Sequence, residues 1–113
     1  MEENHGISRE IRAFVETHRD GWNHDDWLGL IDHLGVLGCD TSDHDAIGLA
    51  LEQERVRDRL RAGGIKGLGP KRIEAVAREF PYLLGLQSAE EAEIAIRTGI
   101  PRKLAREIMK LVV

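Results

Sequence analysis

The chain has 113 residues, which suffices for one ordinary domain or two very small ones and excludes a large catalytic domain. Hydrophobic residues make up 42% and charged residues 32%, so the sequence provides a packed core and is not that of a disordered chain. No apolar run approaches the roughly 20 residues that span a bilayer, and the start, Met1 to Asn4, is acidic, unlike the basic start of a signal peptide. We therefore expect a globular cytoplasmic protein with no membrane partner, in which the single cysteine, Cys39, is a small half-buried residue.

The formal net charge of −4 combines two halves of opposite sign. Residues 1–60 contain 6 Lys and Arg against 14 Asp and Glu, a net charge of −8, whereas residues 61–113 contain 10 against 6, a net charge of +4. Clustered Lys and Arg are what a phosphate-bearing partner requires. The basic half is therefore where we look for function, because the acidic half would repel DNA unless it faces away.

The pattern of residues 1–57 predicts a small, acidic, helical subdomain. A first helix is expected to be capped by Ser8, and a second to start at Asn23, which two aspartates follow in the first turn. We assign Trp22 and Trp27 to the core and place His18 at its edge. The apolar positions that share the inner faces are Ile7, Ile11, Phe14, Val15, Leu30, Ile31 and Leu34.

The remaining elements are also predicted to be helices. Ser42 with Asp45 resembles a capping box, which predicts a long helix that ends at Gly63 and Gly64. A helix should follow the Gly-rich turn and end near Phe80, a short one should begin at the capping box of Ser88, and a last one should follow Pro101. No run of alternating β-branched residues is present, so the predicted fold class is all-α.

The acidic half contains three histidines and six aspartates between His24 and Asp45. Their spacing matches neither a zinc-binding helix, which needs ligands at i and i+4 with a third nearby, nor an EF-hand loop. Helix capping explains most of these aspartates. No motif pairs a nucleophile with a base, so we expect neither a metal centre there nor an enzyme.

Residues 65–80 and 96–111 are two copies of one pattern, in which a Gly-hydrophobic-small turn opens an amphipathic helix. Glycines in such a turn can adopt positive φ, and the helix that follows presents unsatisfied amides and its positive dipole end to an anion. Cations follow each turn directly. With Gly67 aligned on Gly99, the matched pairs are Leu68 and Ile100, Gly69 and Pro101, Lys71 and Lys103, Ile73 and Ala105, and Val76 and Ile108.

The run Gly67-Leu68-Gly69-Pro70-Lys71-Arg72 resembles the helix-hairpin-helix motif, and residues 58–113 resemble the tandem domain of two such motifs found in DNA repair nucleases and junction-binding proteins. The resemblance implies that the hairpins contact the DNA backbone without reading sequence. It implies DNA-binding roles for Gly67, Gly69, Lys71, Arg72, Gly99, Arg102 and Lys103. It also implies that no cofactor is required, and that a monovalent cation at the first hairpin would be held by the carbonyls of Gly63, Ile65 and Leu68.

The second copy departs from the pattern, because Pro101 stands at the second glycine position and has no N–H to donate. We expect this copy to bind more weakly or mainly to pack against the first. The alternative to DNA binding is a module for protein interaction or dimerisation built on the same helical pair. A third hypothesis combines the two, so that the basic half binds DNA and the acidic half recruits a protein partner or a second copy.

Overall fold

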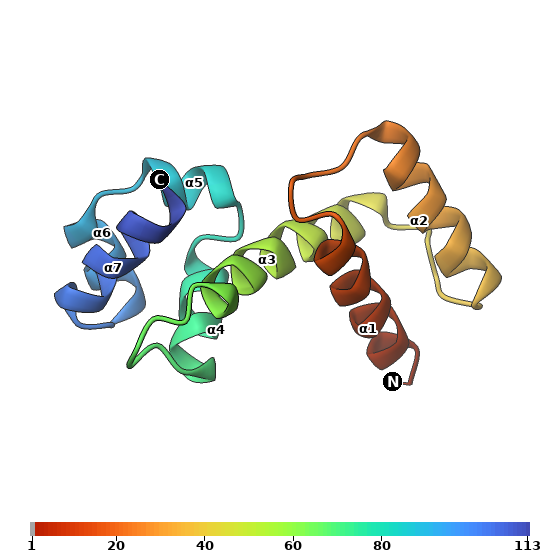
Figure 1. Ribbon diagram of the computed structural model, residues 1–113. Coiled ribbons are helices and arrows are strands. Elements are labelled where there is room, and N and C mark those ends of the chain that lie inside the picture. The colour runs from red at the N-terminus through yellow and green to blue at the C-terminus, as the bar shows by residue number, and fades with distance from the viewer. Residues whose placement is uncertain (1) are drawn as a thin grey trace. The chain divides into compact units, whose positions relative to one another are not determined.

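The structure is a computed structural model that describes residues 2–113, with side chains from Gly6 onward; of the acidic start, Met1 lies outside the described residues. The described residues form helices and no strand, which confirms the all-α class. None of the described helices is both long and apolar enough to cross a membrane. The helices, labelled in Figure 1, are α1 (Glu2–Thr17), α2 (His24–Val36), α3 (His44–Ala62), α4 (Pro70–Glu79), α5 (Leu83–Ser88), α6 (Glu91–Thr98) and α7 (Arg102–Val112).

The chain divides into two compact units, unit 1 (Met1–Leu51) and unit 2 (Glu52–Val113). The division falls inside α3, ahead of the predicted boundary after residue 57. Burial explains the position. Ile47 and Leu51 belong to the core of unit 1, whereas Val56 and Leu60, further along the same helix, are fully buried in the core of unit 2.

The core of unit 1 is formed by side chains from all three of its helical segments, namely Ile11, Val15, Leu30, Leu34, Ile47 and Leu51. Trp22, Trp27 and Cys39 are partly buried and pack against this core, as predicted. His18 is half-buried at its edge and stacks on Phe14 with 4.0 Å between ring centroids. The aromatic residues of unit 1 are therefore packing elements.

The cap predicted for α2 is confirmed and the cap predicted for α1 is wrong. The Asn23 side chain accepts a hydrogen bond from the Asp26 amide at 2.8 Å, and the Asp26 carboxylate accepts one from the Asn23 amide at 3.0 Å. This reciprocal pair satisfies two amides at the helix start. Ser8, by contrast, lies inside α1, because the helix already begins at Glu2.

The other two predicted capping boxes are also wrong. Asp43 caps α3 in place of its neighbour Ser42: its carboxylate accepts a hydrogen bond from the Ala46 amide at 3.0 Å. Ser88 ends α5 rather than opening α6, and its hydroxyl donates to the Leu84 carbonyl at 2.8 Å. For Ser88 the residue pattern is present, but a hydrogen bond within α5 takes up the hydroxyl.

Unit 2 comprises the end of α3 and helices α4 to α7. Helix α5 lies ahead of the short helix predicted to begin at Ser88; it forms because Leu83 and Leu86 are buried on one side of a single short turn. The apolar residues of the repeat face inward, since Val76, Ala105 and Ile108 are fully buried and Ile73 is nearly so. Helix α6 packs against both α4 and α7, so the two copies of the repeat share one core.

Candidate functional site

The two predicted turns of unit 2 have similar backbone conformations. Gly67 and Gly99 both have positive φ, +89° and +76°, a region that favours glycine. The hydrophobic residue that follows each glycine is buried in the shared core. The next residue, Gly69 in the first turn and Pro101 in the second, is the N-cap of α4 or α7, with φ −84° and ψ −177° at Gly69 and φ −59° and ψ 143° at Pro101. In each copy, therefore, the N-cap lies two residues after a left-handed glycine and the helix begins one residue later.

The first turn is closed by a hydrogen bond from the Leu68 amide to the Ile65 carbonyl, with 3.1 Å between N and O. Gly67 is the third residue of this turn, the position at which a type II turn requires positive φ. Leu68 anchors the turn, because its side chain is 8% exposed. The turn is thus held by one backbone bond, one buried side chain and a hydrogen bond from Arg72 Nη1 to the Gly67 carbonyl, and Lys66 and Gly67 are exposed to solvent.

Free amides gather at the start of α4. Within the part of the chain that the structure describes, the amides of Gly67, Gly69, Lys71 and Arg72 donate no hydrogen bond, and α4 has no side-chain cap. The first amide of α4 that donates a hydrogen bond within the protein is that of Ile73, which donates to the Gly69 carbonyl at 3.0 Å. Unsatisfied amides at a helix N-terminus, together with the helix dipole, attract anions.

Cationic side chains surround these amides. Lys66, Lys71 and Arg72 are exposed, and Arg72 folds back so that its Nη1 donates to the Gly67 carbonyl at 2.8 Å. A surface hollow beside the turn is lined by residues 63–67 and Arg72 from the first copy, and by Pro101, Lys103, Leu104 and Glu107 from the second. The structure therefore brings Lys103 to the first turn. Sequence reasoning had not singled out Lys66, although its place between Ile65 and Gly67 is a signal that it belongs to the turn.

The second turn has fewer free donors than the first. The Gly99 amide donates to the Ala95 carbonyl at 2.9 Å, the Ile100 amide donates to Thr98 Oγ1 at 3.4 Å, and Pro101 has no N–H. Among residues 99–103, all of which are described, only Arg102 and Lys103 keep an unpaired amide. The role of Gly99 is thus conformational, and its amide is already engaged within the protein.

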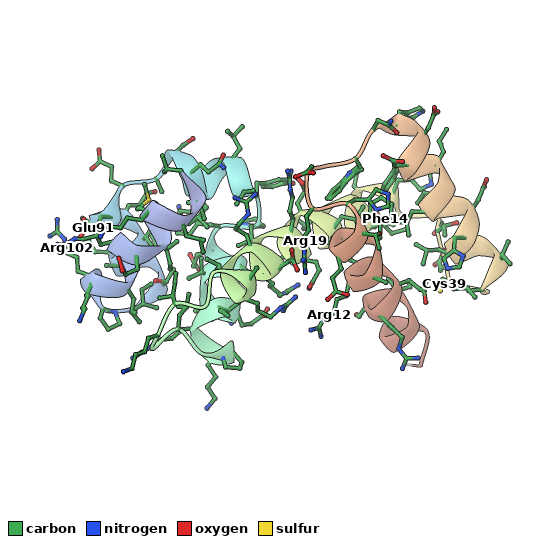
Figure 2. The ribbon with its side chains drawn as sticks, viewed as in Figure 1. Arg12, Phe14, Arg19, Cys39, Glu91 and Arg102 are labelled. Atoms are coloured by element: carbon green, nitrogen blue, oxygen red, sulfur yellow. The ribbon has the colours of Figure 1, made fainter. Side chains whose placement is uncertain are left out.

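The cations of the second copy differ in their surroundings. Arg102 Nε lies 3.3 Å from Glu91 Oε1 (Figure 2). Arg106 contacts the same oxygen at 3.2 Å. Lys103 is exposed and no ion pair is formed by it among the described residues. Lys103 is consequently the second-copy cation best available to an external anion.

The first turn packs against the last helix through Gly63. A Cβ added to Gly63 would collide with the Leu111 side chain, so this position suits a residue without a side chain. Of the three carbonyls predicted for a monovalent cation, those of Gly63 and Ile65 belong to residues that line the hollow, whereas Leu68 is not among its lining residues. Among the described residues, no group of three or more His, Cys, Asp and Glu side chains is placed to hold a metal ion.

Comparisons of this chain with models of protein families, with curated proteins and with solved structures found no match.

Proposed function

We propose that unit 2 binds the sugar-phosphate backbone of DNA without reading its sequence, as a binding module rather than an enzyme. The observation that carries the proposal is the group of unpaired amides of Gly67, Gly69, Lys71 and Arg72 at the start of α4, with lysine and arginine side chains beside them. Backbone amides and helix N-termini bind phosphate oxygens, which carry no sequence information. Affinity should therefore depend on salt and not on base sequence.

The resemblance of this segment to the helix-hairpin-helix motif supports the same proposal. Under this proposal the first copy holds the phosphate, Lys103 and Arg102 of the second copy add positive charge, and Gly99 shapes the second turn. A monovalent cation held by the carbonyls of Gly63, Ile65 and Leu68 also belongs to the proposal, and replacing potassium with tetramethylammonium at constant ionic strength tests it. A cytoplasmic location and a place in DNA repair go with this proposal.

The test is a fluorescence-anisotropy titration of the full chain against labelled single-stranded, duplex and branched DNA at two salt concentrations. Lys71→Ala/Arg72→Ala should weaken binding to every sequence and flatten the dependence of log K on log salt, by about 0.9 for each phosphate of duplex DNA that the variant no longer neutralises. The matched control is Arg78→Ala/Lys110→Ala, which removes the same charge from exposed positions near the helix C-termini. If both double variants lose affinity equally, the assignment of the site to the turn is wrong.

A protein-interaction module is the second candidate, and exposed apolar side chains on unit 2 favour it. Leu84 is 73% exposed and Ile96 is 82% exposed. Single exposed apolar residues are common on protein surfaces, so we place this candidate second. Sedimentation of the chain without DNA separates the two: a mass that rises with concentration, together with no salt-sensitive DNA binding, supports the interaction module.

A further inference from the structure

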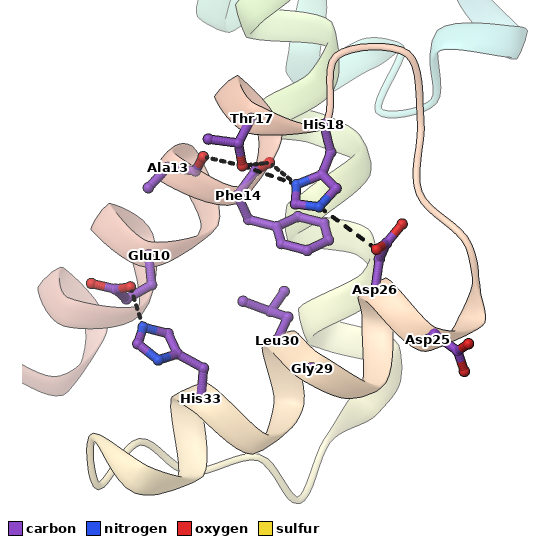
Figure 3. A pocket seen from close by; sticks show the side chains of 10 residues that line it. All are labelled: Glu10, Ala13, Phe14, Thr17, His18, Asp25, Asp26, Gly29, Leu30 and His33. Atoms are coloured by element: carbon purple, nitrogen blue, oxygen red, sulfur yellow. Dashed lines mark hydrogen bonds and ion pairs between the residues drawn. The ribbon is translucent and has the colours of Figure 1, made fainter.

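Unit 1 contains a groove between α1 and α2 that the proposed DNA-binding function does not use (Figure 3). It follows α1 from Glu10 to Thr17 and α2 from Asp25 to His33, which is about two turns, or roughly 10 Å, of each helix. Its volume is about 430 Å³, within the range of pockets that accept ligand groups. The groove therefore offers an elongated surface along two helices rather than a closed cavity.

The floor of the groove is apolar. Phe14 and Leu30 face each other across it, and Ala13 and Gly29 widen it because they have small side chains or none (Figure 3). A Cβ added at Gly29 would meet nothing within 4 Å, so the space beside this part of α2 is open. Such a floor suits one or two large apolar side chains from a binding partner.

Two histidine–carboxylate pairs link the helices on either side of this floor. His33 Nε2 of α2 lies 2.8 Å from Glu10 Oε1 of α1, and His18 Nε2, just after α1, lies 3.8 Å from Asp26 Oδ1 of α2 (Figure 3). These pairs join the two walls of the groove on either side of its floor. The groove is present in the structure without a partner, and a surface formed in advance loses less entropy on association.

The charge of the groove is negative. Glu10, Asp25 and Asp26 line it, and no Lys or Arg is among the described residues that do so. Unit 1 as a whole has 3 Lys and Arg against 11 Asp and Glu, a net charge of −8. A partner with positive charge is attracted to this surface, and one with negative charge is repelled.

We propose that this groove binds a basic amphipathic helix of a protein partner. The helix would place apolar side chains at positions i and i+3 or i+4 over Phe14 and Leu30, and its lysines or arginines beside Glu10 and Asp26. The elongated shape fits the helix-in-groove mode of recognition, and the partner helix would complete a layer with α1 and α2. The negative charge of the lining decides in favour of a basic partner.

The experiment uses the full chain and two synthetic helical peptides that share a leucine face. One peptide carries lysine on its remaining positions and the other carries glutamate. Binding is measured by isothermal titration calorimetry without DNA, for the wild type, Gly29→Leu and Gly35→Leu. Gly29→Leu fills the open floor of the groove, whereas Gly35→Leu is the matched control, since it adds the same side chain to an exposed position of α2 that does not line the groove.

The expected result is binding of the lysine peptide that weakens at higher salt, is at least about tenfold tighter than binding of the glutamate peptide, and is lost in Gly29→Leu but kept in Gly35→Leu. Absence of binding, equal affinity for both peptides, or equal affinity of the two variants would overturn the proposal. Self-association of the chain that only Gly29→Leu abolishes would also overturn it, because the occupant would then be a second copy. DNA titrations of the same variants report on unit 2, so the two proposals fail independently.

Discussion

Replacing Gly69 with proline tests the role of the backbone amides, because it removes one amide and leaves every charge in place. The substitution reproduces in the first turn what Pro101 does in the second. Gly69 has φ −84°, within about 20° of the proline value, and ψ −177°, an extended value suited to the proline that follows. Gly69→Ala is the control, since it keeps the amide and its Cβ meets nothing within 4 Å.

The expected loss follows from the energy of one hydrogen bond to a charged acceptor. Such bonds contribute about 1.5–3 kcal/mol, and about 1.4 kcal/mol corresponds to a tenfold change in affinity. Gly69 is exposed, so the lower end of this range applies, and Gly69→Pro should bind DNA about tenfold more weakly than Gly69→Ala. The slope of log K against log salt should stay the same in both variants, because the number of neutralised phosphates is governed by lysine and arginine.

Anisotropy titrations of both variants at three or more salt concentrations measure the loss and the slope together. Circular dichroism of each variant checks that the helical content is that of the wild type. If a folded Gly69→Pro binds DNA as tightly as Gly69→Ala, the amide of Gly69 makes no phosphate contact. A parallel loss of affinity and slope would instead assign the effect to displaced lysine and arginine side chains.

Three further predictions concern the same unit. Pro101→Gly supplies the amide that the second turn lacks, so DNA affinity should rise by about threefold to tenfold with no change in salt slope; unchanged affinity in the titration would show that this amide does not limit the second turn. Gly67→Ala must adopt φ near +89°, which costs about 1–2 kcal/mol and should lower the Tm by several degrees in a thermal melt, whereas a Tm equal to that of Gly69→Ala would contradict the strain argument. Two hydrogen bonds from Arg57, at 2.8 and 2.9 Å, hold the pKa of the Glu74 carboxyl below its ordinary value. Their contribution is therefore present above the unfolded pKa of about 4.3 and is lost as the pH falls through the folded pKa. Glu74→Gln should lower the free energy of unfolding by no more than about 1 kcal/mol at pH 7, since Glu74 is half exposed. In urea titrations the difference from wild type should shrink as the pH falls below about 4.3 and vanish once Glu74 is protonated in the folded protein as well; a difference that does not shrink with pH would assign it to packing.

The helices of the chain could be predicted because their apolar periodicity reflects burial, whereas the residues that cap them could be predicted only in part. Asn23 was identified as a cap because two carboxylates reinforce it, whereas Ser42 and Ser88 match the same local pattern and cap nothing. A serine near a helix end has several hydrogen-bond partners within reach, and tertiary packing selects among them. At the start of α3 the carboxylate of the neighbouring Asp43 accepts the hydrogen bond from the Ala46 amide. Before α6 the residue that was expected to cap the helix, Ser88, is the last residue of α5.

The residues of the candidate site could be predicted from the sequence, but which of their amides and cationic side chains are left unpaired could not. The glycine spacing identified both turns, since positive φ at Gly67 and Gly99 is a local requirement of the chain. The sequence does not reveal that the Gly99 amide is engaged with Ala95, that Arg102 contacts Glu91, or that Lys103 lies beside the first turn. These features depend on how α6 and α7 pack, and therefore on contacts between distant residues.

The contact between Gly63 and Leu111 has a consequence for the order of events during synthesis. The turn that follows α3 is synthesised before α7, so the Leu111 side chain that it packs against does not yet exist when the turn is made. Domains fold as units once their sequence has emerged, and long-range contacts of this kind form late. A nascent chain would therefore expose the glycine-rich turn without its final shape, and the proposed phosphate site would be complete only after α7 docks.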